Sequence, residues 1–528
     1  MNSWRMQREV HYDNRLMKCF VGRPRSVIAM FRATVRRLPD QVALVAGEER
    51  LTYHQLDIRV SRMASHLSAI GFRAGERIGI LLGNCPEFAV TVLASAYIGL
   101  IAVPMNIRQR RPEIAYMLSH CAAACLVVTT SLASEIPDSD EIPSIRQIFE
   151  VGGSLIPMAR SFDALGRDVQ PVEEFEADEE DPFCILYTSG TTGKPKGAVL
   201  THLGVVHSVI HYEIAFGLVE ADIALLAVPA SHVTGLVAIL LTSFHIGGTA
   251  ILLEAFKARA FLDVAERERV SYTLMVPTMY NLILLDPSIE QYDLGCWRIG
   301  GFGGAPMPTT TIERVTQYLP SLALANIYGA TETTSPATVL VPGQVSKHAD
   351  SVGVALPCAD IIVCDESGAE LDDGQSGEIW IGGPMTIPRY WDDPTADKVS
   401  FVRGFWRSGD IGTVDADGYL RVLDRKKDVI NRGGYKIYCI EVENVIASYP
   451  GIRECAIVGR PDEILGERSH AFVFASGMSV DIGVLRDYCA NCLSDYKVPD
   501  FITILDVPLP RNANGKIAKR DLKNQAIV

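Results

Sequence analysis

The chain has 528 residues, which exceeds one ordinary domain, and its 48% hydrophobic content is ample for large cores. A formal net charge of −14 and the lack of any long Lys/Arg run argue against a protein that binds nucleic acid. The charged N-terminal segment lacks the apolar core of a signal peptide, and Gly and Pro interrupt both long uncharged stretches, so we expect no transmembrane segment and a cytoplasmic location.

Alternating helices and strands are predicted for the first part of the chain. Residues 51–71 form an expected helix, because Thr52 and Gln55 have the spacing of a capping box and apolar residues recur along one face. Strand-like runs follow at 78–82 and 126–129, with helical stretches between them. This alternation is typical of α/β proteins with parallel sheets.

The most informative segment lies at 188–197, between short apolar runs at 183–187 and 198–200 that are typical of buried strands. Its glycines permit tight turns that aim backbone N–H groups inward, while its hydroxyl side chains and two lysines suit a phosphate. A flexible surface loop is the alternative, but it does not explain so many donors after a buried strand. The expected anion cradle consists of Thr188, Ser189, Gly190, Thr191, Thr192, Gly193, Lys194, Lys196 and Gly197.

Later segments are ambiguous when each is considered alone. Four glycines around Phe302, in 300–307, would let the backbone approach a flat ligand, although glycine clusters also form plain turns. His232 is about equally consistent with a functional histidine and with a hydrogen-bonded structural one. Taken singly, Glu332 and Lys516 are typical of solvated side chains in polar loops.

The end of the chain predicts a small α+β unit. A charged turn at 424–428 follows a short strand at 419–423, and an amphipathic helix is expected at 440–449. Strand-like runs at 456–458 and 471–474 come next. A unit of about a hundred residues is an ordinary domain size.

The segment at 188–197, with the strand before it, resembles the phosphate-binding signature of the adenylate-forming (ANL) superfamily. This superfamily includes acyl-CoA synthetases, stand-alone adenylation domains and firefly-type luciferases. Further segments similar to family motifs follow in order, namely GGFGGAPM, YGATET, WRSGD, DRKKD, NRGGYK and PRNANGK, so the resemblance extends from about Thr52 to Lys516. It implies an α/β fold with a large multi-layered N-terminal domain over 1–424 and a small mobile α+β C-terminal domain over 425–528.

The resemblance also implies where ATP and magnesium bind. Glu332 would hold Mg²⁺, Thr331 would contact the α-phosphate, and Asp410 would accept the two ribose hydroxyls. Tyr328 would stack on adenine. The implied nucleotide site comprises Thr188, Ser189, Gly190, Thr191, Thr192, Gly193, Lys194, Lys196, Gly304, Ala305, Tyr328, Gly329, Asp410 and Arg425.

The remaining implied residues concern the acid, the thiol and the chemistry. Lys516 would bridge the substrate carboxylate and the α-phosphate, and it would be catalytic together with Thr331 and His232. The acid would lie against His232, Val233, Phe302, Gly303 and Ala330, CoA would approach a loop of Arg432, Gly433 and Gly434, and Lys427 would be the hinge between domains. Ser231 replaces the aromatic residue that relatives carry before His232. The pocket candidates include no Arg or Lys, which disfavours a second carboxylate on the acid and leaves medium-chain, branched and aromatic monocarboxylates open.

The activity implied is that of an ATP-dependent acid–CoA ligase. A carboxylic acid and Mg·ATP would give acyl-AMP and pyrophosphate, and coenzyme A would then displace AMP to give acyl-CoA. Alternatives are a stand-alone adenylation enzyme that loads a carrier protein, a luciferase-like oxygenase, and a nucleotide-binding protein without turnover. The sequence leaves open which acid is activated and whether the chain forms a homodimer.

Overall fold

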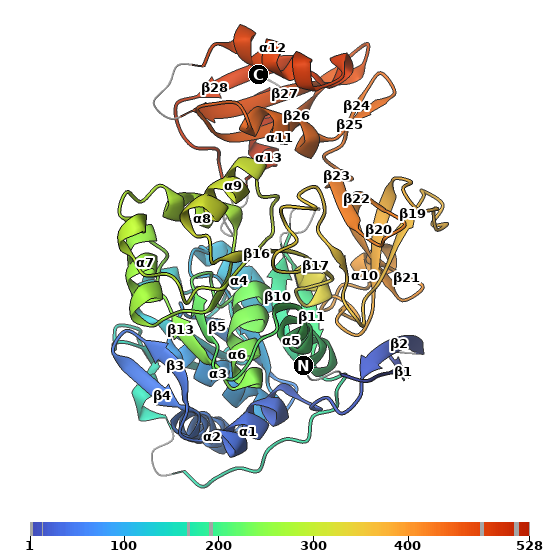
Figure 1. Ribbon diagram of the computed structural model, residues 1–528. Helices are drawn as coiled ribbons and strands as arrows, with labels where there is room; N and C mark the ends of the chain where they lie inside the picture. The colour runs from blue at the N-terminus through green and yellow to red at the C-terminus, as the bar shows by residue number, and fades with distance from the viewer. Residues whose placement is uncertain are drawn as a thin grey trace.

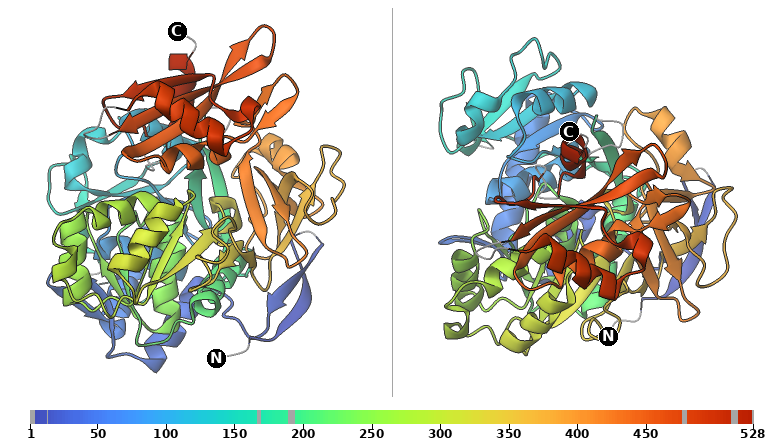
Figure 2. Two further views of the ribbon diagram at one scale, coloured as in Figure 1. Left: turned by 45° about the horizontal axis from the view of Figure 1, so that its top comes forward. Right: turned by 90° about the horizontal axis from the view of Figure 1, so that it is seen from above.

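The computed structural model describes residues 4–12, 14–165, 169–188, 194–475, 480–511 and 517–526. These residues form a large α/β part and a smaller α+β part that sits against one end of it (Figure 1). The same division is visible from two further directions (Figure 2). Two large sheets, a smaller five-stranded sheet and an N-terminal hairpin belong to the large part, and the small part has its own five-stranded sheet. The α/β class expected from the sequence is confirmed.

A seven-stranded sheet carries the segment expected to bind phosphate. Its order is β11-β10-β6-β5-β7-β8-β9, and its pairs are parallel except β10 with β11. The strands are β5 (Arg77–Leu81), β6 (Ile101–Pro104), β7 (Cys125–Thr129), β8 (Gln147–Val151), β9 (Arg160–Ser161), β10 (Pro182–Thr188) and β11 (Lys196–Thr201). The buried strand predicted at 183–187 is confirmed as β10.

A nine-stranded sheet forms the second large layer. Its order is β18-β17-β16-β15-β14-β12-β13-β3-β4, parallel from β16 to β3 and antiparallel at both edges. The strands are β3 (Val42–Ala46), β4 (Glu49–Thr52), β12 (Ile223–Leu226), β13 (Thr249–Leu252), β14 (Tyr272–Met275), β15 (Ile299–Gly303), β16 (Ala323–Tyr328), β17 (Thr338–Leu340) and β18 (Val354–Ala355). One hydrophobic core extends across both sheets.

Helices pack on these sheets and between them. The expected capping box of α2 (Tyr53–Ala69) is confirmed, because Thr52 Oγ1 accepts from Gln55 N at 3.2 Å and Gln55 Oε1 accepts from Thr52 N at 2.9 Å. α3 (Pro86–Tyr97) is buried nearly throughout, since it is apolar on all sides. The other helices of the large part are α1 (Val27–Arg37), α4 (Arg111–His120), α5 (His202–Phe216), α6 (Thr242–Ile246), α7 (Ala258–Arg267), α8 (Pro277–Leu284), α9 (Thr309–Tyr318), α10 (Pro394–Ser400) and the π-helix η3 (Thr234–Leu241). Among the described residues, no helix is long and apolar enough to cross a membrane.

A third, antiparallel sheet leads the chain towards the small part. It consists of β19 (Asp360–Cys364), β20 (Gly377–Gly382), β21 (Phe401–Val402), β22 (Phe405–Val414) and β23 (Leu420–Arg425). β23 pairs with β22, so that Arg425 is opposite Asp410. The strand predicted at 419–423 is thereby confirmed.

The small part has a hydrophobic core of its own, which begins at Ile430. Its elements are β24 (Ile430–Arg432), β25 (Tyr435–Ile437), α11 (Cys439–Ala447), β26 (Ile452–Asp462), β27 (Gly466–Ala475), α12 (Ile482–Cys492), β28 (Phe501–Leu505) and α13 (Lys519–Ala526). The strands predicted at 456–458 and 471–474 are confirmed but much longer, because their charged ends hid the continuation of β26 and β27.

An N-terminal hairpin of β1 (Met6–His11) and β2 (Arg15–Phe20) packs on α5. Phe20 stacks on His207 with ring centres 5.4 Å apart, and its backbone N–H donates to His207 Nε2 at 3.2 Å. The sequence did not predict this hairpin.

Candidate active site

Several of the predicted residues that the structure describes lie at or just beyond the carboxyl ends of three strands. β10 ends at Thr188, β15 at Gly303 and β16 at Tyr328. The 3-10 helix η5 (Thr331–Thr333) follows β16, and its Glu332 Oε1 accepts a hydrogen bond from Thr188 Oγ1 at 3.3 Å. This bond joins the two large sheets, so one site takes residues from both. Ligands of open α/β sheets bind beyond the carboxyl ends of the strands.

The expected phosphate segment is described only at its two flanks. Ser189, Gly190, Thr191, Thr192 and Gly193 lie outside the described residues. On the later flank, Lys194 Nζ is 5.8 Å from the centre of the Tyr116 ring, and the Tyr116 hydroxyl donates to the carbonyl of Pro195 at 3.1 Å. Tyr116 belongs to α4, so this helix supports the segment. Sequence reasoning missed Tyr116, because no local pattern distinguishes it from other helix aromatics.

Gly197 is not a turn residue of the cradle, and the sequence interpretation of it is wrong. It lies inside β11 opposite Tyr187. A Cβ at Gly197 would come within 2.8 Å of Ile185 and 3.2 Å of Trp391. Its carbonyl also accepts a hydrogen bond from the backbone N–H of Trp391 at 2.7 Å. Close packing against Ile185 and Trp391, rather than a tight turn, therefore explains the glycine.

Glu332 fits a magnesium ion held jointly with substrate phosphates. It is 9% exposed, and its Oε1 accepts hydrogen bonds from the hydroxyls of Thr188 at 3.3 Å and Tyr390 at 3.0 Å. None of the ion pairs found within the described ranges includes Glu332, and Oε2 takes no part in these two bonds. A single carboxylate with one oxygen outside these two hydrogen bonds suits Mg²⁺, which usually keeps waters and takes only one or two carboxylates. Sequence reasoning missed Tyr390, whose contact spans 58 positions of the chain.

Asp410 lies within β22, opposite Arg425 of β23, and is 5% exposed. The Tyr328 hydroxyl donates to its Oδ2 at 2.6 Å, and Arg425 Nε lies 2.8 Å from its Oδ1. Burial, and then the Asp410 carboxylate, raise the pKa of Tyr328 well above its ordinary value, so this tyrosine stays a neutral donor. The structure thus brings Tyr328, Asp410 and Arg425 together, and a carboxylate with two acceptor oxygens suits a ribose diol.

Three of the predicted catalytic and acyl-site residues line one small cavity. His232, Val233 and Thr331 share a cavity of about 40 Å³. His232 Nδ1 lies 3.1 Å from the hydroxyl of Thr234, a contact that orients the imidazole. The cavity is completed by Ser231, whose position the sequence had indicated, and by residues that it had not, namely Pro104, Asn106, Gln109, Met117, Leu186 and Tyr187. Phe302, Gly303 and Ala330 are not part of its lining; Phe302 is only 1% exposed, within β15.

Close packing within the protein accounts for two glycines of the 300–307 segment. A Cβ at Gly303 would lie 2.5 Å from the carbonyl oxygen of Ile327, and one at Gly300 would lie 2.9 Å from the hydroxyl of Tyr280. Gly304 differs, because its φ is +77° and its nearest neighbour lies 4.0 Å from such a Cβ. Gly304 and the following Ala305 are exposed and remain suited to a ligand.

The loop expected to approach CoA is the tight turn between β24 and β25. Gly433 and Gly434 have φ values of +60° and +90°, and this left-handed backbone requires glycine. Arg432 lies at the end of β24, and its guanidinium forms an ion pair with Asp500 at 3.0 Å. The two glycines therefore lie at an exposed turn, whereas Arg432 forms an ion pair within the small part.

Two predicted residues remain, the hinge residue Lys427 and the catalytic Lys516. Lys427 is exposed in the short connection between β23 and β24. Lys516 lies outside the described residues, which resume at Ile517. Arg511 and Ile517, on either side, are joined by an isolated β-bridge.

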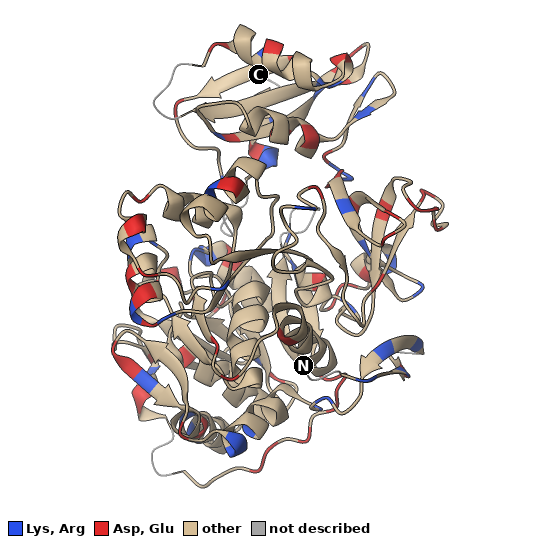
Figure 3. Cartoon of the chain, in the orientation of Figure 1, with Lys and Arg blue, Asp and Glu red and all other residues tan. Residues whose placement is uncertain are grey.

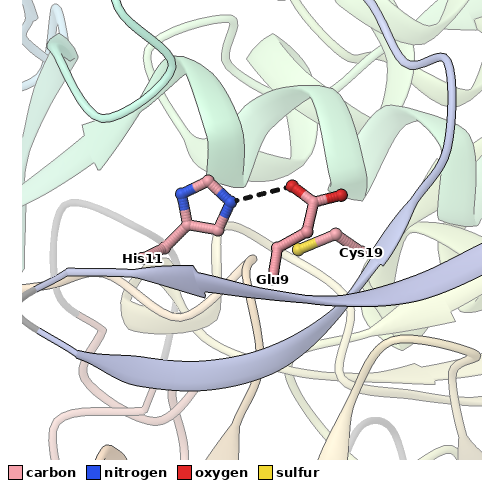
Figure 4. Close-up of side chains that lie close together, drawn as sticks. All are labelled: Glu9, His11 and Cys19. Carbon is pink, nitrogen blue, oxygen red and sulfur yellow. Dashed lines mark hydrogen bonds and ion pairs between the residues drawn. The ribbon is translucent and has the colours of Figure 1, made fainter.

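A polar cluster on the N-terminal hairpin has the residue types of a metal site, but a nearby arginine and a protonated thiol make it unsuited to a cation. Potential ligand atoms of Glu9, His11 and Cys19 all lie within 4.8 Å of one another (Figure 4). Arg23 donates to both Glu9 oxygens, at 2.9 and 2.7 Å, and pairs with Glu179 at 2.8 Å. Burial raises the pKa of the Cys19 thiol to about 12, so it is protonated at neutral pH. The guanidinium already neutralises Glu9, and the cluster fastens the hairpin to the large part.

Charged residues of both signs lie on the elements of the fold. Lys and Arg are interspersed with Asp and Glu over the elements in view (Figure 3). No continuous basic stripe runs along the described elements in that orientation. Interspersed charges of both signs are typical of an ordinary soluble surface.

Two family descriptions match the chain. AMP-binding enzyme matches residues 31–391, and AMP-binding enzyme C-terminal domain matches residues 441–516. The chain belongs to this family of adenylate-forming enzymes. The feruloyl-CoA synthase of an Amycolatopsis species is 35% identical over 492 residues, which cover 93% of this chain and 97% of that protein. The long-chain-fatty-acid–CoA ligase FadD13 of Mycobacterium tuberculosis is 31% identical over 503 residues, which cover 94% and 97%.

Solved structures agree in fold over nearly the same length. The o-succinylbenzoate CoA synthetase of Bacillus subtilis, in complex with its acyl-adenylate intermediate, aligns with a TM-score of 0.84 and 29% identity, covering 94% of this chain and 97% of that chain. The same synthetase with ATP and a magnesium ion aligns with a TM-score of 0.82 and 30% identity, covering 94% and 98%. The expected membership of the ANL superfamily, in its acid–CoA ligase branch, is confirmed.

Proposed function

We propose that the chain is an ATP-dependent acid–CoA ligase. It joins a carboxylic acid to AMP with release of pyrophosphate, and it then transfers the acyl group from acyl-AMP to the thiol of coenzyme A with release of AMP. The observation that carries the proposal is one site that unites the phosphate strand, the buried carboxylate of Glu332 and the carboxylate of Asp410. The named relatives and solved structures support the same two-step reaction.

In the first step the chain must hold three phosphates and a cation. The segment from Thr188 to Lys196 is assigned to the phosphates, with its lysines offsetting their negative charge. Glu332 is assigned to Mg²⁺, which when bound would neutralise phosphate charge and favour departure of pyrophosphate. Asp410 is assigned to the ribose, and Tyr328 to the face of adenine.

The acid is a monocarboxylate whose remaining part carries no second anionic group. His232, Val233 and Thr331 line the described cavity, and no Lys or Arg lines it with them. A charged group buried there without a partner would be strongly disfavoured. A medium-chain, branched or aromatic monocarboxylate satisfies this condition.

The second step depends on movement of the small part. We assign the mobile domain to residues 425–528, with Lys427 as the hinge. β23 ends at Arg425 and the core of the small part begins at Ile430, so the hinge lies in the connection between them. Lys516 would serve the adenylation orientation, and the Gly433–Gly434 turn would serve thioester formation. Such alternation supplies cations for phosphate first and space for a thiol afterwards.

The test is a panel of carboxylic acids with Mg·ATP, assayed with and without CoA by pyrophosphate release and product mass. Acyl-CoA and AMP formed from one class of acid would support the proposal and name the substrate. Acyl-AMP that forms but does not react with CoA would favour loading of a carrier-protein thiol. If the chain consumed no ATP with any acid of the panel, the proposal would be contradicted.

A further inference from the structure

The segment 387–391 crosses the candidate site between its phosphate strand and its expected metal carboxylate. At one end the backbone N–H of Ile387 donates to the carbonyl of Glu332 at 2.9 Å. At the other end the N–H of Trp391 donates to the carbonyl of Gly197 in β11 at 2.7 Å. Tyr390, between them, forms an antiparallel bridge with Ala198. This segment therefore fixes the separation between η5 and β11.

The side chain of Tyr390 contacts one cation and one carboxylate of the candidate site, Lys196 and Glu332. Its hydroxyl donates to Glu332 Oε1 at 3.0 Å, and Lys196 Nζ lies 5.0 Å from the centre of its ring. The tyrosine is 4% exposed, and its backbone N–H is anchored by Asp397 Oδ1 at 2.7 Å.

An ammonium and a carboxylate brought close together in a partly buried site would attract each other. Lys196 and Glu332 do not form an ion pair with each other; Lys196 instead lies over the aromatic face, where a cation is stabilised by the ring. Glu332 uses one oxygen for the hydroxyls of Tyr390 and Thr188. Each charge is thus stabilised without being neutralised by the other.

We propose that Tyr390 is a positioning residue, which keeps Lys196 apart from Glu332 and orients the Glu332 carboxylate towards a divalent cation. The inference rests on the proposed function, since it concerns the same nucleotide site. Lys196 is thereby kept for a phosphate oxygen and Glu332 for the metal. Nothing in the segment's sequence indicates this role, because Tyr390 lies outside every motif singled out above.

Two substitutions separate the hydroxyl from the ring. Tyr390→Phe keeps the ring under Lys196 but removes the donor to Glu332, so binding of Mg·ATP should weaken by about 10-fold, as expected for loss of a hydrogen bond to a charged group. Binding of AMP without metal should stay within about 2-fold, because the phenyl ring of this variant still holds Lys196 over its face. Tyr390→Leu removes the ring as well, so Lys196 can pair with Glu332 and both ligands should bind more weakly.

The measurement is isothermal titration of the full chain with Mg·ATP and, separately, with metal-free AMP. Tyr53→Phe is the matched control: Tyr53 is also buried, and its hydroxyl donates to the carbonyl of Gly248 at 2.7 Å, within the core. This control should leave both affinities unchanged while costing stability. In the Glu332→Gln background, Tyr390→Phe should have no further effect on the metal dependence of ATP binding, because Tyr390 acts through Glu332.

The outcomes distinguish the inference from the proposed function. If the wild type binds Mg·ATP and forms acyl-CoA, but Tyr390→Phe leaves Mg·ATP binding unchanged, the inference alone is overturned. An equal loss of Mg·ATP and AMP binding in Tyr390→Phe would show a merely structural role and would also overturn it. A wild type that binds no Mg·ATP would contradict the proposed function and the inference together.

Discussion

At the scale of single residues, the site holds two carboxylates through two tyrosine hydroxyls. Tyr328 donates to Asp410 at 2.6 Å, and Tyr390 donates to Glu332 at 3.0 Å. Sequence motifs indicated Glu332, Asp410 and Tyr328, since each stands in a recognisable segment. Tyr390 could not be found in this way, because only the fold brings it to Glu332.

The bond between Tyr328 and Asp410 predicts unequal effects on AMP binding for two conservative substitutions. Asp410→Asn should weaken AMP binding by about 10-fold or more, because a neutral amide is a poorer acceptor for the ribose diol than a carboxylate. Tyr328→Phe should stay within about 3-fold, since the flat ring is kept and one competitor for Asp410 is removed. Titration with AMP checks both; equal losses in the two variants would contradict the assignment of Asp410 to the ribose.

A second prediction at this scale concerns Gly303. A Cβ at this position would lie 2.5 Å from the carbonyl of Ile327, so Gly303→Ala should lower the free energy of unfolding by about 1–3 kcal/mol. Gly295→Ala is the control, because its nearest neighbour at 3.2 Å is the carboxylate of the Asp293 side chain, which can move. Chemical denaturation compares the variants. An unchanged stability in Gly303→Ala with weaker acid binding would mean that the glycine serves a ligand instead.

At the scale of elements, local signals predicted what local interactions create. The helix α2 was predicted because its capping box and its apolar face both consist of residues close together in the sequence. The turn role of Gly197 was predicted wrongly, because the partner that requires glycine there, Trp391, is remote in sequence. The lining supplied by Met117 of α4 and by Gln109, in the connection between β6 and α4, was missed for the same reason: both reach the cavity only through the packing of the seven-stranded sheet.

The helix α5 carries a prediction about pH. Its His202, His207 and His211 are buried, and burial lowers their pKa values to about 4, 3 and 3. The unfolded chain takes up protons at these histidines below pH ~6.5, whereas the folded chain does not until the pH nears the lowered values. Stability of the large part should therefore fall as the pH is lowered from about 6.5, by up to about 1.4 kcal/mol per pH unit for each histidine.

His211→Leu tests this account, because neither ring nitrogen of His211 has a hydrogen-bond partner among the described residues. The variant should be more stable than the wild type at pH 5 and should gain less at pH 7.5. His54→Gln, at an exposed position, should leave the pH dependence unchanged. Thermal unfolding at the two pH values gives the comparison, and a parallel pH dependence in His211→Leu and the wild type would contradict the burial argument.

At the scale of the whole molecule, the two-part architecture was predicted from the order of the motifs. Thr188, Glu332 and Asp410 belong to the large part, and the Gly433–Gly434 turn, which we assign to the CoA step, belongs to the small part. Composition and periodicity alone gave only α/β layers followed by a small α+β unit. The arrangement of the two large sheets, joined at Thr188 and Glu332, depends on contacts that no local pattern contains.

Division of labour between the two parts predicts a selective loss on changing Lys516. Lys516→Ala should abolish adenylation, because no cation would stabilise the charge that rearranges at the α-phosphate. Thioester formation from supplied acyl-AMP and CoA should survive, since the lysine is assigned only to the first orientation. Each half-reaction is assayed separately with the same enzyme preparation, and equal loss of both would refute the division.

The central claim is that acyl transfer to CoA passes through acyl-AMP. The most direct measurement is a single-turnover reaction of the wild-type chain with Mg·ATP and an accepted acid, to which CoA is added after a delay, with all species followed by mass. We predict that acyl-AMP and pyrophosphate accumulate first, and that acyl-CoA and AMP then replace the adenylate at the moment CoA is added. Formation of ADP, or of acyl-CoA without a preceding adenylate, would contradict the account.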